Sequence, residues 1–93
     1  MLSDNDLAFA IIEMAERSMT LHPSIRDDVE HHGEPALAVM GTLSVTRTAG
    51  VFIDPDLIEE AVRRWPNDRG SGLVGEWTEY AQELRAKATT ESP

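Results

Sequence analysis

Apolar side chains recur at the spacing of an α-helix near the start of the chain, and this pattern constrains the fold more than any other feature. Leu7, Ile11 and Ala15 lie one helical turn apart, and Ile12 widens the apolar side. Ser3 precedes them with a hydroxyl that can accept a hydrogen bond from an otherwise unpaired backbone N–H of a first turn. The sequence therefore predicts a first helix that begins at Ser3 and is buried on more than one side.

Proline residues mark the limits of the next helices. Pro23 ends the first helix, because the residue before a proline is disfavoured in the α region, and a capping box beginning at Ser24 predicts a second helix over about 24–32. Pro35 is tolerated in a first turn and opens a third helical segment. From 42 to 53 many residues are β-branched and part of the run alternates, which leaves a continuing helix and a short β-hairpin as alternatives.

Two amphipathic helices are predicted in the second half of the chain. Asp54 as a capping residue and Pro55 at the first helical position indicate a helix over 54–65. A loop that contains proline and glycine then precedes a last helix over about 72–88.

Together these elements predict an all-α, compact single domain of four or five short helices over residues 1–88, with a disordered tail over 89–93. The first helix and the two C-terminal helices are expected to supply most of the core through Leu7, Ile11, Ile12, Leu57, Ile58, Ala61, Trp65, Leu73, Trp77 and Leu84. The absence of cysteine excludes disulfides, and the acidic start of the chain is unlike a secretory signal. No apolar run is long enough to span a membrane, so we expect a cytoplasmic protein.

Negative charge is the most unusual feature of the composition. The 93 residues include 17 acidic and 8 basic side chains, for a net charge of −9, and residues 1–46 hold 8 of the acids but 2 of the bases. Such a field repels nucleic-acid backbones and anionic lipids. It favours basic partner proteins, or it serves solubility alone.

Two groups of residues are candidates for contact with a partner protein. The first is acidic and lies around the end of the second predicted helix: Asp27, Asp28, Glu30 and Glu34. The second surrounds a tryptophan with arginines, a composition typical of interface hot spots: Arg63, Arg64, Trp65 and Arg69. The alternative for Trp65 is a core contact with Trp77, because each tryptophan falls on the apolar side of its own helix.

Motifs for catalysis or metal binding are weak. Asp27 and His31 lie one helical turn apart, as two metal ligands would, so a small metal-dependent enzyme using Asp27, Glu30, His31 and Glu34 is an alternative to a solvated helix end. His22 is predicted to be a loop or capping residue. No serine lies in a nucleophile turn, and Gly70-Ser71-Gly72 lacks the spacing and lysine of a phosphate-binding loop. We therefore expect no enzyme, no metal and no cofactor.

From Thr46 to about Arg85 the chain has the order of a possible short strand, a helix starting at Asp54-Pro55, a turn with Gly70-Ser71-Gly72 and a second helix. This order resembles the ribbon-helix-helix repressors and antitoxins, in which strands from two chains enter the DNA major groove. The resemblance implies a dimeric DNA-binding regulator in which Arg47 reaches bases and the Gly70-Ser71-Gly72 helix start contacts phosphate.

The leading hypothesis is instead a non-enzymatic protein-binding module. Its acidic surface would meet a basic surface on a partner protein, and it would act as a regulator, an inhibitor or an accessory subunit. Whether the protein is a monomer or a dimer is left open by the sequence.

Overall fold

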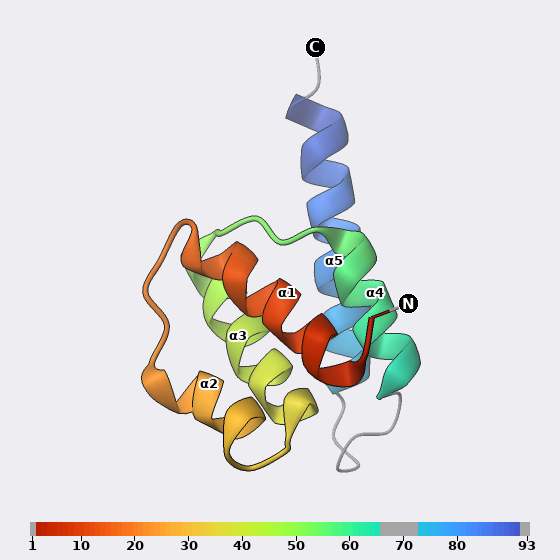
Figure 1. Cartoon of the computed structure of the whole chain (residues 1–93). Helices are drawn as coiled ribbons and strands as arrows, with labels where there is room; N and C mark the ends of the chain where they lie inside the picture. The colour runs from red at the N-terminus through yellow and green to blue at the C-terminus, as the bar shows by residue number, and fades with distance from the viewer. Residues whose placement is uncertain (1, 66–72, 92–93) are drawn as a thin grey trace.

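The computed structural model describes residues 2–65 and 73–91, and over these residues the protein consists of five helices and no strand (Figure 1). The helices are α1 (Asp4–Glu16), α2 (Pro23–Glu30), α3 (Pro35–Ala49), α4 (Pro55–Arg64) and α5 (Leu73–Glu91). The predicted all-α fold is therefore confirmed. None of these helices combines the length and the apolar character that a membrane crossing requires.

Two helix starts form through the local hydrogen bonds expected from the sequence. The Ser3 hydroxyl accepts a hydrogen bond from the backbone N–H of Asp6 at 3.1 Å, so α1 is capped as predicted. The Asp54 carboxylate accepts from the backbone N–H of Asp56 at 2.9 Å, and Pro55 is the first residue of α4. Both starts depend on neighbours in the sequence, which is why they are predictable.

The start of α2 differs from the predicted capping box. His22 is the capping residue, and its Nδ1 atom accepts a hydrogen bond from the backbone N–H of Ser24 at 3.1 Å. Pro23 is then the first residue of the helix. The prediction of a capping box that begins at Ser24 is therefore wrong by two residues, because the histidine ring supplies the acceptor. The prediction of His22 as a capping residue is confirmed.

The hairpin alternative for residues 42–53 is also wrong, because α3 continues to Ala49. Thr42 and Thr46 are completely buried, and their hydroxyls donate to carbonyl oxygens four and three residues earlier in the same helix. These hydrogen bonds pair the two hydroxyl groups, which would otherwise be costly to bury. Gly50 ends the helix with a φ of 74°, in the left-handed region that glycine adopts without strain.

The core lies where α1 and α2 pack on α3 and where α4 packs on α5, with further contacts of α1 with α4 and of α3 with α5. Most of the predicted core residues that the structure describes are buried: Leu7, Ile11, Ile12, Ile58, Ala61, Trp77 and Leu84. Leu57 and Trp65 are only partly buried against this core. The side chain of Leu73 lies outside the described part of the structure.

The C-terminal half of α5 projects beyond the body of the protein (Figure 1). The helix extends to Glu91, so its last turn lies inside the segment predicted as a tail, and residues 92–93 lie outside the described residues.

Replacing glycine by alanine is expected to have opposite effects on stability at two positions. Gly75 lies inside α5, where an added Cβ would meet no atom within 4 Å, so Gly75→Ala should raise the free energy of unfolding by about 0.5–1 kcal/mol. Gly50 also has open space around it, but its positive φ makes Gly50→Ala destabilising by roughly 1 kcal/mol. Urea denaturation of both variants checks the pair, and a stabilising Gly50→Ala would contradict the end assigned to α3.

Candidate protein-binding surface

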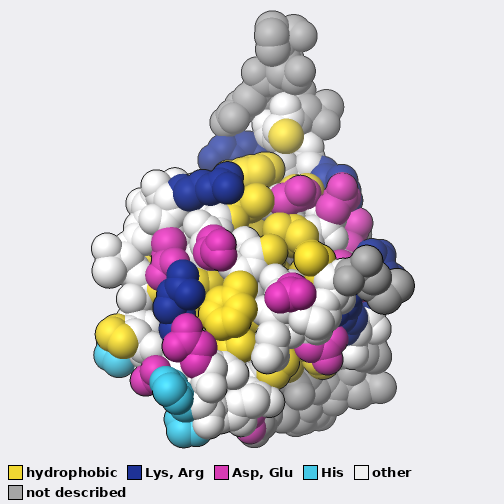
Figure 2. All heavy atoms as spheres, in the orientation of Figure 1, with side chains coloured by type: hydrophobic (Ala, Val, Ile, Leu, Met, Phe, Trp, Pro, Cys, Tyr) yellow, Lys and Arg dark blue, Asp and Glu magenta, His cyan; other side chains and the backbone are white. Residues whose placement is uncertain are grey.

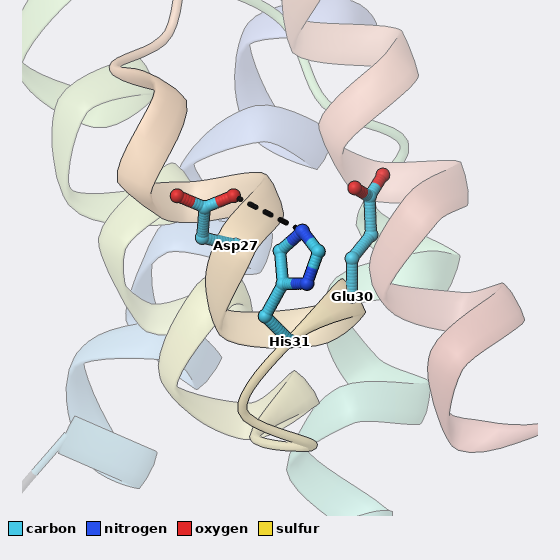
Figure 3. A group of neighbouring side chains, drawn as sticks. All are labelled: Asp27, Glu30 and His31. Carbon is cyan, nitrogen blue, oxygen red and sulfur yellow. Dashed lines mark ion pairs between the residues drawn. The ribbon is translucent and has the colours of Figure 1, made fainter.

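The acidic residues predicted around the end of α2 do not all share one environment. Asp27 and Glu30 are exposed, whereas Asp28 and Glu34 are partly buried. Figure 3 shows Asp27 and His31 pointing toward each other, with 3.8 Å between Oδ1 of the aspartate and Nε2 of the histidine. Glu30 extends on the other side, toward α1. The three side chains therefore lie side by side at the exposed end of α2.

Three of the four residues considered for a metal site do come together. Asp27, Glu30 and His31 each offer one ligand atom, and these atoms lie within 4.8 Å of one another. All three side chains are exposed, and Glu34 is not a member of the group. The pair of Asp27 and His31 also has the i, i+4 spacing of an ordinary ion pair on a helix surface. This arrangement fits a solvated helix end as well as a weak cation site.

A larger acidic cluster forms where α1 and α2 meet around Arg26. The Arg26 guanidinium donates to the Glu16 carboxylate, with Nη2 and Oε1 2.5 Å apart, and lies 5.6 Å from the centre of the Phe9 ring. The hydrogen bond with Glu16 and the negative charges of Glu30 and Glu13 raise the pKa of Arg26. One arginine is thus surrounded by carboxylates from two helices.

We call this surface the α1–α2 acidic face. It consists of Glu13, Glu16 and Glu30 around Arg26, together with Asp27, whose carboxylate lies within 4.8 Å of that of Glu30. Phe9 lies beneath Arg26 and packs against the core. Figure 2 shows hydrophobic side chains on this side of the molecule with acidic and basic side chains around them. The cation–π contact with Phe9 and the ion pair with Glu16 hold Arg26 in place. Because the carboxylates around it outnumber this one arginine, the surface is predominantly negative.

Carboxylates on α4 and α5 are more fully matched by arginine. Arg85 donates to Asp56 and Glu59 at 2.7 and 2.6 Å. Arg47 donates to Glu83 at 2.7 Å, and that hydrogen bond raises the pKa of the Arg47 guanidinium. Among the described residues, the negative charge is therefore least compensated on α1 and α2.

The second predicted group, Arg63, Arg64, Trp65 and Arg69, does not form one exposed patch, because Arg64 is bonded within the fold. The Arg64 side chain is 14% exposed and donates to the Asp4 carboxylate at 3.0 Å, the Leu2 carbonyl at 2.6 Å and the Glu60 carboxylate at 2.8 Å. Through these bonds it joins the N-terminal residues to α4.

The other members of that group have separate surroundings. Arg63 pairs with Glu60 at 2.6 Å on the surface of α4. Trp65 ends α4 and is partly buried against the core. Arg69 lies outside the described residues. A hot spot at Trp65 would therefore have to use the part of the indole that the core does not cover.

Sequence reasoning missed an exposed aromatic side chain in the segment between α3 and α4. Phe52 is 55% exposed and borders a small cavity of about 110 Å³ together with Gly50, Leu84 and Lys87. The signal in the sequence is the continuous apolar run Val51-Phe52-Ile53, which predicts a short extended segment but does not indicate which of its side chains is exposed.

Comparison with family models, with curated protein sequences and with solved structures gives no significant match.

Proposed function

We propose that this protein is a non-enzymatic protein-binding module that engages a basic surface of a partner protein through the α1–α2 acidic face. The observation that carries the proposal is the uneven charge compensation. Glu13, Glu16 and Glu30 share Arg26, and Asp27 pairs only with His31, whereas the carboxylates of α4 and α5 are paired with several arginines. A face of one sign steers a partner of the opposite sign and favours a matching orientation.

The physical character of the face suits a partner surface rich in lysine or arginine. Its carboxylates belong to two helices held together by the core, so they need little reorganisation when a partner binds. Because the carboxylates are exposed, each new ion pair would add little affinity by itself and would be weakened by salt. The proposed interaction is therefore salt-sensitive and depends on several charges together.

A DNA-binding role is not proposed. The strand required by the ribbon-helix-helix resemblance would lie between Thr46 and Asp54, but residues 46–49 belong to α3 and residues 51–54 form no strand. Arg47 is paired with Glu83. The resemblance therefore lacks its ribbon within the described part of the chain.

Affinity capture from cells of the native host tests the proposal. We expect the immobilised protein to retain a basic protein at low salt and to release it as salt is raised. Glu13→Gln combined with Glu30→Gln should weaken that binding by roughly threefold to tenfold, because two exposed charge contacts are lost.

The matched control neutralises two carboxylates of α5, with Glu76→Gln and Glu79→Gln, and should leave binding nearly unchanged. Both control residues are exposed and the change in net charge is the same. Recovery of no partner at low salt would contradict the proposal. Equal weakening by the two variants would show that overall charge, and not this face, is responsible.

A further inference from the structure

A second surface beside the acidic face is an open groove between α2 and α3, with a volume of about 410 Å³. Its apolar lining comes from Ile25, Leu37 and Met40. Gly41 also lines it, and a Cβ at this position would lie 3.8 Å from the Ile25 side chain. The missing side chain of a helical glycine thus leaves space where the two helices approach each other.

The charged side chain in the lining of the groove is negative. Asp28 lines the groove with Ser24 and Ser44, and no lysine or arginine is among the lining residues. Asp28 is partly buried, and within the described part of the chain its carboxylate has no ion-pair partner. A half-buried carboxylate beside apolar side chains favours a ligand that carries both an apolar group and a positive charge.

A second copy of this chain is a poor occupant of the groove. Each copy has a net charge of −9, so bringing another acidic surface against Asp28 would be opposed by repulsion. A basic partner has the complementary charge.

We propose that the α2–α3 groove accepts an apolar side chain from a segment of the partner protein, while an adjacent lysine or arginine of that segment pairs with Asp28. This inference rests on the proposed function and specifies one of its contacts. The apolar side chain supplies selectivity that the exposed acidic face lacks, because burial in a shaped groove depends on the size of the side chain.

Amide chemical shifts of the full chain, followed by NMR, test the groove with short synthetic peptides. The probe is acetyl-Gly-Lys-Leu-Lys-Gly-amide, with matched peptides in which alanine replaces the leucine or glutamate replaces both lysines. We expect the leucine peptide to shift the signals of Ser24, Gly41 and Ser44 and to bind roughly tenfold more tightly than the alanine peptide. The glutamate peptide should cause no shifts.

Variants of the groove complete the test. Gly41→Leu should fill the space and abolish the shifts at Ser24 and Ser44, whereas Gly41→Ala, whose Cβ meets Ile25 at an ordinary distance, should retain them. Asp28→Asn should weaken binding of the leucine peptide roughly threefold to tenfold. Because Ser44 is exposed, Ser44→Trp offers a second way to block the groove if Gly41→Leu fails to fold.

The outcomes separate the groove from the acidic face. Equal binding of the leucine and alanine peptides, or shifts confined to Glu13, Glu16 and Glu30, would overturn the groove and leave the proposed function intact. No shift with any peptide would also overturn it, and capture of a basic partner by the same protein would show that the proposed function survives. If the protein captures no basic partner and the peptides do not bind in the groove, the groove proposal and the proposed function are both wrong.

Discussion

Replacing Trp77 with alanine is expected to lower the free energy of unfolding by about 3–5 kcal/mol. The side chain lies on α5, is 5% exposed and belongs to the main core cluster. Its removal would leave a cavity where α5 packs against the rest of the protein. Because small domains are stabilised by about 5–15 kcal/mol in total, the variant should be close to the limit of folding at room temperature.

Trp65→Ala is the matched comparison, because it removes the same side chain from a partly buried position. We expect a smaller loss of roughly 1–3 kcal/mol, since part of the indole is already in contact with water. Urea denaturation followed by far-UV circular dichroism measures both variants. Equal losses would mean that Trp65 is as deeply packed as Trp77, and no loss at all would contradict its contact with the core.

Tyr80→Phe is expected to cost about 1–3 kcal/mol, although it removes a single oxygen. The buried Tyr80 hydroxyl lies 3.0 Å from the carbonyl oxygen of Val51 and 3.1 Å from the hydroxyl of Thr46. These contacts join α5 to α3 and to the segment that follows it. Phenylalanine fills the same space but leaves the Val51 carbonyl without this donor. A variant as stable as the wild type would show that water replaces the hydroxyl.

The same residue predicts a dependence on alkaline pH. Burial raises the pKa of the Tyr80 phenol above its ordinary value of 10.0. The folded state therefore holds this proton more tightly than the unfolded state, so the stabilisation is present below about pH 10 and is lost as pH rises through the folded-state pKa. Between about pH 9 and pH 11 the wild type should lose more stability than Tyr80→Phe, as measured by urea denaturation. An equal loss in both proteins would assign the effect to other groups.

The sequence by itself determined the helices whose signals are local. Ser3 caps α1, and Asp54 with Pro55 starts α4, through contacts between residues two or three positions apart. The apolar spacing of α1 likewise placed Leu7 and Ile11 in the core. Such features depend on the geometry of one helix and its neighbours in the chain, so they are the same before and after the rest of the protein packs.

Only the tertiary structure decided the conformation of residues 42–49. Their β-branched side chains fit either a helix or a strand, so the local pattern is ambiguous. In the folded protein Thr46 is completely buried and lies beside the Tyr80 hydroxyl, 34 positions away in the sequence. Packing of α3 against α1, α2 and α5 selects the helix, because it buries one side of this segment while the threonine hydroxyls are satisfied.

The candidate surface, too, could be predicted only in part from the sequence. The excess of acid in the first half of the chain and the charges of Asp27 and Glu30 were evident from the sequence. The approach of Glu13 and Glu30 to Arg26, and the placement of Arg26 over Phe9, appear only when α1 and α2 are packed together. Electrostatic energy depends on distance in space and not on separation along the chain, so the fold alone determines which charges act together.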